Sequence, residues 1–343
     1  SLDDVKQWFR TWYGPNNAVL VLAGDIDVAT ARRKVAQYFG DIPAGPTMAQ
    51  PAVDVAKRSA DTRETMEDQV PQVRIYRAWN VAELGTTEID HLQVLGSILG
   101  GAKASRLDRR LLHDDRLVDN ISAGAYGSQL GSNFVVMATV KQGVDPATVE
   151  QAIDEELERL ITEGPSTEEL ERAKTSFRAG FVRGIERIGG FGGKADALAE
   201  CTVYEGDPGC FRDSLANVAA TTAEDVKAAG AKWLDVGSHT ITVVPGARTP
   251  LAEEPAVTPA PFTPPAPDAK YTITRSTIDR STGVPKTASF PELKFPAQAR
   301  ATLSNGTQVI LARRPEIPVV QLSYEFKGGY TADLGRTPGT ASF

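Results

Sequence analysis

Two helical patterns and one continuous apolar run occupy the first 43 residues of the chain. A first helix is predicted over about residues 2–12, where apolar residues recur at the spacing of one helix face: Val5, Trp8, Phe9 and Trp12. Residues 18–23 are apolar without alternation, which predicts a strand buried on both faces. A second helix begins after Asp27 and ends at Gly40, with its buried face at Val28, Ala31, Val35 and Phe39. This order is ordinary scaffold, so no chemistry is assigned to the segment.

Residues 67–245 form the largest block of strand and helix patterns. Strand patterns fall at residues 73–79, 118–126, 134–141 and 239–244. Helix patterns fall at residues 88–99, from Ser105 onward, between Asp145 and Gly164, from Ser166 through Phe181, and from a capping box at residues 221–224 to about Trp233. Gly100 and Gly101 stop the first of these helices. The order of elements predicts an α+β fold, with a mostly antiparallel sheet packed on helices, rather than a doubly wound sheet.

Two proline-containing stretches are predicted to connect the compact parts. Residues 45–66 combine Pro, Ala and Gly with mixed polar residues and are interpreted as a linker. Residues 246–290 are interpreted as an extended, semi-rigid second linker, because prolines are dense between Pro255 and Pro267. Beyond it, residues 301–311 predict a hairpin with an Asn-Gly turn, and residues 319–326 alternate as a strand. The compact parts are therefore expected at residues 1–44, 67–245 and 291–343.

Composition and charge narrow the function classes. The chain has 343 residues, of which 41% are hydrophobic and 24% charged, which is typical of a soluble globular protein with two or three domains. The formal net charge of −7 argues against a nucleic-acid surface, which needs basic patches. No apolar run approaches the roughly 18 residues of a membrane span, and the first residues lack the pattern of a signal peptide. Neither nucleic acid nor a membrane span is therefore expected.

The three histidines of the chain do not form a recognisable metal site. His91, His113 and His239 lie far apart in the sequence, and each is interpreted as a structural or surface residue. A site made of His113, Asp114 and Asp115 is a weak candidate, because adjacent residues on a helix do not share a face.

Other catalytic patterns also fail. The glycine-rich residues 189–194 differ from a phosphate-binding loop, because Ile188 and Ala195 stand where Gly and Ser or Thr are required. The acidic residues within 154–158 are interpreted as a solvated helix face rather than a catalytic carboxylate pair. The sequence has no Gly-x-Ser-x-Gly turn, so a serine hydrolase has no support.

Several motifs, taken in order, resemble the pitrilysin/insulinase family of inverted-zincin metallopeptidases. The end of that family's first subdomain is similar to Phe9, Tyr13-Gly14-Pro15-Asn16-Asn17-Ala18, Ala23-Gly24-Asp25 and Tyr38-Phe39-Gly40-Asp41-Ile42-Pro43. The second subdomain has counterparts of Gly100-Gly101, Ser105-Arg106-Leu107, Gly206-Asp207-Pro208 and Thr222-Ala223-Glu224-Asp225-Val226. The resemblance implies metallopeptidase-like subdomains, the end of a first-half N-terminal subdomain at 1–44, a first-half C-terminal subdomain at 67–245, and the start of a second half at 291–343.

The resemblance further implies a two-half bacterial zinc metalloendopeptidase, of which this chain is an internal fragment. In the family, His-x-x-Glu-His on a helix and a further glutamate bind zinc, and the motif glutamate is the general base. No histidine here fits that motif, so the zinc of the parent is expected upstream, and no catalytic residue or metal ligand is assigned to this chain. The parent is expected to cleave peptides in an enclosed chamber, and this chain alone is expected to be inactive. The alternative is a non-catalytic partner or scaffold subunit of the same family.

The sequence departs from the family pattern at substrate-contact positions and at a zinc-ligand position. Family members often carry an Arg and a Tyr that contact substrate after the Ser-Arg-Leu motif, and the aligned positions here are Asp115 and Asp119. No substrate-binding residue is therefore assigned. Ser342 stands where the first zinc-binding histidine of a second half would be, and a hydroxyl does not replace an imidazole as a typical zinc ligand. The second half is therefore expected to be inactive.

The resemblance also implies partners and a compartment. A peptide or unfolded polypeptide is the expected substrate, a homo- or heterodimer is compatible with the family, and a periplasmic or secreted location is implied. Cys201 and Cys210 flank a turn. In such a location they either form a disulfide or remain free thiols in a helical core, and the sequence leaves both open.

Overall fold

The computed structural model describes residues 1–48, 54–250, 266–284, 286–287, 289, 292, 294–315 and 318–340. The chain divides into two compact units, Ser1–Lys286 and Thr287–Phe343. The prolines at positions 255 to 265, on which the second predicted linker depends, lie outside the described residues, and so does Ser342.

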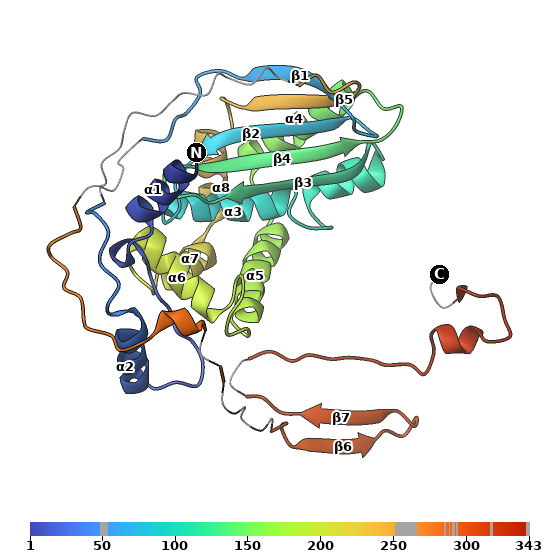
Figure 1. The fold of residues 1–343 in the computed structure, drawn as a ribbon. Helices are drawn as coiled ribbons and strands as arrows, with labels where there is room; N and C mark the ends of the chain where they lie inside the picture. Colours follow the sequence, from blue (N-terminus) through green and yellow to red (C-terminus); the bar gives the residue numbers. More distant parts are fainter. Residues whose placement is uncertain are drawn as a thin grey trace. The chain divides into compact units, whose positions relative to one another are not determined.

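A five-stranded sheet organises the first unit (Figure 1). Its strands, in spatial order, are β1 (Thr62–Asp68), β5 (His239–Pro245), β2 (Arg74–Val81), β4 (Ser132–Val140) and β3 (Val118–Tyr126). β1 runs parallel to β5, and the other neighbouring strands are antiparallel. The predicted α+β fold with a mostly antiparallel sheet is confirmed.

Helices cover one face of this sheet (Figure 1). α3 (Thr87–Leu99), α4 (Pro146–Glu163) and α8 (Ala223–Trp233) lie next to the strands, and α5 (Thr167–Gly184), α6 (Lys194–Glu205) and α7 (Phe211–Ala220) lie beyond α3 (Figure 1). α3 packs against β3 and α8, and it also contacts α5 and α7. The core lies between the sheet and these helices, where Trp79 of β2 meets Phe134 of β4 edge to face at 6.0 Å between ring centroids. Among the helices within the described ranges, none is both long and apolar enough to cross a membrane.

Side-chain caps begin several helices close to where the sequence predicts them. Ser166 and Glu169 form the predicted capping box at the start of α5, because each side chain bonds the backbone N–H of the other residue. The box of α8 lies one residue beyond its predicted place, because the hydroxyl of Thr222 pairs with Asp225.

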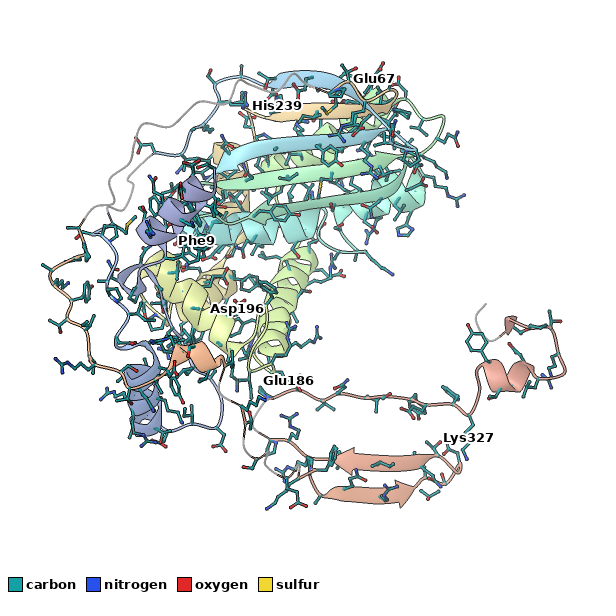
Figure 2. All side chains as sticks on the ribbon, viewed as in Figure 1. Phe9, Glu67, Glu186, Asp196, His239 and Lys327 are labelled. Atoms are coloured by element: carbon teal, nitrogen blue, oxygen red, sulfur yellow. A yellow bond between two sulfur atoms is a disulfide. The ribbon has the colours of Figure 1, made fainter. Side chains whose placement is uncertain are left out.

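The N-terminal segment contains both predicted helices, α1 (Leu2–Trp12) and α2 (Val28–Phe39), but the predicted strand between them is wrong. A buried strand needs neighbours that pair its N–H and C=O groups, and no strand of the described residues lies beside residues 18–23. The apolar stripe of α1 is uncovered as well, with Trp8 52% and Phe9 49% exposed (Figure 2). The segment therefore presents an apolar surface.

β1 corrects the predicted end of the first linker. Residues 62–66, predicted within linker 45–66, pair with β5 from Thr62 opposite His239 to Met66 opposite Val243. The side chains of β1 are almost all exposed, because β1 is an edge strand. Its sequence therefore lacks the apolar alternation by which a strand is recognised.

The described residues 266–284 of the second predicted linker lie against the end of α2. Arg280 donates to both carboxylate oxygens of Asp41, at 2.8 and 2.6 Å, and to the backbone oxygen of Tyr38 at 2.8 Å. The backbone N–H of Thr274 donates to the oxygen of Gly40 at 2.7 Å. A bidentate ion pair and a backbone hydrogen bond thus join this part of the connection to residues 38–41.

The second unit, described by itself, holds the predicted hairpin. β6 (Gln298–Thr302) and β7 (Gln308–Ala312) pair antiparallel, and Gly306 in the turn adopts a φ of 85°, which favours glycine. The strand predicted at residues 319–326 is wrong, because those residues have no regular structure and no described strand pairs with them. A short 3₁₀-helix follows at Tyr330–Asp333.

A disulfide between Cys201 and Cys210 settles the choice that the sequence leaves open. It joins the second half of α6 to the N-cap residue of α7, with the two Cα atoms 5.4 Å apart. Closing so short a loop stabilises the folded chain by about 2–3 kcal/mol in the chain-entropy description. The alternative of two free thiols is excluded.

Candidate functional site

His239 and His113 each have a structural neighbour, and His91 is half-buried in α3. His239 of β5 (Figure 2) shares a hydrogen bond of 2.8 Å between its Nδ1 and the hydroxyl of Thr62. His113 is exposed, and its Nε2 lies 3.2 Å from the carboxylate of Asp108. Within the described ranges, no three His, Cys, Asp or Glu side chains are grouped closely enough to hold a metal ion. The weak candidate at His113, Asp114 and Asp115 therefore does not form such a group.

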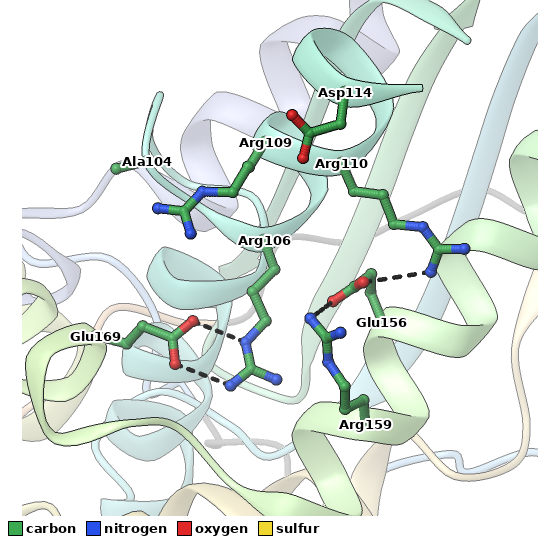
Figure 3. A pocket seen from close by; sticks show the side chains of 8 residues that line it. All are labelled: Ala104, Arg106, Arg109, Arg110, Asp114, Glu156, Arg159 and Glu169. Carbon is green, nitrogen blue, oxygen red and sulfur yellow. Dashed lines mark hydrogen bonds and ion pairs between the residues drawn. The ribbon is translucent and has the colours of Figure 1, made fainter. Parts of the chain in front are cut away.

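A cavity of about 470 Å³ opens where the chain leaves α3 and turns towards β3 (Figure 3). We call it the arginine pocket, and it is lined by Ala104, Arg106, Arg109, Arg110, Asp114, Glu156, Arg159 and Glu169. The residues from 104 to 114 belong to one stretch, Glu156 and Arg159 come from α4, and Glu169 comes from the first turn of α5.

A π-helical segment, η2 (Asp108–Asp114), presents the first group of arginines. Its wide turn is visible in the hydrogen bond from the Asp115 N–H to the Arg110 oxygen, five residues back, at 2.8 Å. Leu107 and Leu111 anchor this segment in the core, while Arg109 faces solvent. Short π-helical turns occur often at functional sites.

Arg106 joins three elements at one wall of the pocket. Its Nε and Nη2 donate to the two carboxylate oxygens of Glu169 at 2.8 and 2.9 Å, and Nη2 also donates to the Gly164 oxygen at 2.9 Å. The Arg106 hydrogen bonds are the largest cause that lowers the pKa of Glu169 to about 2. The remaining nitrogen, Nη1, is buried and has no partner within the described part of the chain. A buried donor left unpaired costs about 1–3 kcal/mol.

Glu156 is the buried carboxylate of the opposite wall, with 3% exposure. Its two oxygens accept from Arg110 Nη1 at 3.3 Å and from Arg159 Nη2 at 2.5 Å. Arg110 also donates to Glu155 and to Asp115, and the bond to Glu155 is the largest cause that raises the pKa of Arg110. Two guanidinium groups thus compensate the burial of one carboxylate.

Arg109 and Asp114 stand at the rim of the pocket (Figure 3). Both side chains are exposed, and neither has a hydrogen-bond or ion-pair partner within the described residues. Four arginines and three carboxylates line the cavity, so the lining carries one net positive charge. The arrangement is suited to binding a planar anion through guanidinium groups.

Asp115 and Asp119, which occupy the expected substrate-contact positions, have local partners instead. Asp115 accepts from Arg110 at 3.4 Å, and Asp119 accepts from Gln72 Nε2 at 2.5 Å. Sequence reasoning missed the arginine pocket. The close spacing of Arg106, Arg109 and Arg110 was the available signal for it.

A family model described as the peptidase M16 inactive domain matches residues 1–177. The uncharacterized zinc protease YmxG of Bacillus subtilis is 26% identical over 188 residues, which cover 54% of this chain and 44% of the relative. The zinc protease PqqE of Helicobacter pylori is 24% identical over 193 residues, covering 54% and 43%. The chain therefore spans about half the length of the curated relatives it matches.

Solved structures share the fold. A protease from Helicobacter pylori superposes with a TM-score of 0.66 at 19% identity, covering 71% of this chain and 59% of that one. A peptidase M16 inactive domain from Pseudomonas fluorescens gives a TM-score of 0.63 at 20% identity, covering 74% and 59%.

Proposed function

The chain belongs to the peptidase M16 family, and on this premise we propose that it is a non-catalytic part of a zinc metalloendopeptidase. The observation that carries the proposal is the match of residues 1–177 to a domain described as inactive. Relatives named as zinc proteases support it. The M16 family is the pitrilysin/insulinase family of the sequence motifs, so that resemblance is confirmed.

The exposed apolar surface of residues 1–44 supports the proposed division into subdomains. Trp8, Phe9 and Trp12 are each about half exposed, although their spacing is that of a buried helix face. We assign residues 1–44 to the end of a first-half N-terminal subdomain whose other residues cover this face. Residues 67–245, with β1 added, form the first-half C-terminal subdomain, and residues 291–343 begin an inactive second half.

The described residues do not fit a zinc site, so no step of peptide hydrolysis is assigned to them. A zinc ion held by residues of the upstream half would supply Lewis-acid polarisation of the peptide carbonyl and an activated water. The role proposed for this chain is to help enclose a peptide or unfolded polypeptide in the chamber where the upstream half cleaves it.

Zinc content tests this function. We expect the 343-residue chain to hold no stoichiometric zinc and to leave a labelled unfolded casein intact. The full polypeptide encoded by the gene is expected to carry His-x-x-Glu-His upstream of Ser1, to bind zinc and to cleave the casein. Elemental analysis and release of the label are the two measurements.

A full polypeptide with the motif glutamate replaced by glutamine is the matched control, since it should keep zinc and lose cleavage. Stoichiometric zinc on the 343-residue chain would overturn the assignment. A full polypeptide without the motif and without cleavage would support the alternative, a non-catalytic partner or scaffold subunit.

The disulfide supports a periplasmic or secreted location, because structural disulfides persist in oxidising compartments. We expect Cys201 and Cys210 in protein taken directly from cells to resist a maleimide reagent until a reductant is added. Mass spectrometry measures the labelling. Labelling of both thiols before reduction would contradict export.

A further inference from the structure

We propose that the arginine pocket binds the carboxylate of a peptide. The inference rests on the proposed function, since it names the chemical group of the peptide that this part of the protein holds. It adds a binding site to a chain in which no catalytic or metal-binding residue is assigned.

The first observation is the unused donor of Arg106. Two of its nitrogens hold Glu169, and its side chain is only 10% exposed. Figure 3 shows the third nitrogen pointing away from Glu169, towards the wall that carries Arg159. This nitrogen, Nη1, is the buried atom without a partner. Because Glu169 and Gly164 fix the guanidinium plane, the donor is preorganised for an acceptor that enters the cavity.

The second observation is the free guanidinium at the rim. Arg109 has no partner among the described residues, in contrast to Arg110, which contacts three carboxylates. Arg159 uses one nitrogen on Glu156 and keeps the others available. An entering acceptor would therefore meet donors from two directions, from the η2 side and from α4.

Charge selects a singly charged anion. The lining carries one net positive charge, and this count already includes the unpaired carboxylate of Asp114 at the rim. Beyond the lining, Glu155 and Asp115 contact Arg110. A phosphate dianion would meet these carboxylates with twice the charge, whereas a planar carboxylate matches the guanidinium fork. A cavity of about 470 Å³ also has room for the last residues of a peptide or for one acidic side chain.

Calorimetric titration of the 343-residue chain with short peptides tests the proposal. The probes are acetyl-trialanine with a free carboxyl terminus, the same peptide as its amide, the amide with a central glutamate, and inorganic phosphate. We expect a carboxylate-bearing peptide to bind and the neutral amide to give no signal. Which of the two carboxylate peptides binds more tightly identifies the source as a chain terminus or an acidic side chain.

Two variants at the rim of the pocket are expected to change carboxylate affinity in opposite directions. Arg109→Ala should weaken carboxylate binding about tenfold, because it removes a charged donor. Asp114→Asn should tighten binding about two- to threefold, because it removes a nearby like charge. Both side chains are exposed and unpartnered, so both variants should keep the fold, which circular dichroism checks.

Arg183→Ala is the matched control. Arg183 is exposed in the last turn of α5, roughly 21 Å along the helix axis from Glu169, and its removal should leave affinity unchanged. Equal affinity of wild type and Arg109→Ala, binding of the neutral amide, tighter binding of phosphate, or no binding of any carboxylate would each overturn the proposal. The titration needs no zinc, so its outcome is separate from that of the zinc experiment.

Discussion

Replacement of Glu169 by glutamine is expected to lower the free energy of unfolding by about 2–4 kcal/mol at neutral pH. The change leaves the Arg106 guanidinium largely buried without its bidentate partner. Glutamine can still accept from the Ser166 N–H, so the capping box of α5 is retained. Urea denaturation followed by tryptophan fluorescence measures the loss.

The pH dependence of stability separates the ion pair from a packing effect. The pKa of Glu169 is lowered from 4.5 to about 2, so this pair contributes its full stabilisation above about pH 4.5. The contribution, at most about 3 kcal/mol, is lost as the pH falls from 4.5 towards 2. Glu169→Gln should lack this part of the acid-induced loss.

Glu168→Gln is the matched control, one residue earlier in the same turn. Its side chain is 89% exposed and, within the described part of the chain, pairs only with Arg172 at 3.3 Å, so a change within about 0.5 kcal/mol is expected. Equal losses in the two variants would show that the Arg106 pair does not stabilise the fold.

The Arg106–Glu169 pair also shows which contacts of the site can be predicted from the sequence and which cannot. The capping residues Ser166 and Glu169 lie three residues apart, so their pattern is visible along the chain. Arg106 lies 63 residues from Glu169, and only the tertiary fold brings the two together. A site assembled across such distances leaves no local motif.

The errors in strand prediction have the same physical origin. Residues 18–23 and 319–326 have strand-like apolar patterns, but a strand forms only where another strand accepts its hydrogen bonds. β1 is the opposite case. Its exposed residues have no apolar pattern, and yet they form a strand because they pair with β5. The apolar pattern of the sequence therefore predicted strands with a buried face, such as β2 and β4. It did not predict whether a segment finds a neighbouring strand with which to pair.

Gly100 ends α3 at a point where the helix lies close to β3. Gly100→Ala is expected to lower the free energy of unfolding by about 2–4 kcal/mol. A Cβ at this position would lie 2.5 Å from the backbone nitrogen and 2.7 Å from the Cβ of Ala123 in β3, so the helix or the strand must move. Gly124→Ala, in the same strand, is the control, because no atom of the residues that the structure describes lies within 4 Å of its added Cβ. Thermal and urea denaturation measure both variants.

Gly100→Asn distinguishes the two reasons for having glycine here. From the sequence, Gly100 is a helix stop, a role that asparagine also fills when the residue adopts a left-handed conformation. The structure gives Gly100 a φ of −154° and a hydrogen bond from the Ala123 N–H to its oxygen at 3.2 Å. Close approach of α3 to β3, rather than a left-handed turn, therefore requires the glycine. Asparagine should be at least as damaging as alanine. A tolerated Gly100→Asn would restore the helix-stop interpretation and refute the close-contact one.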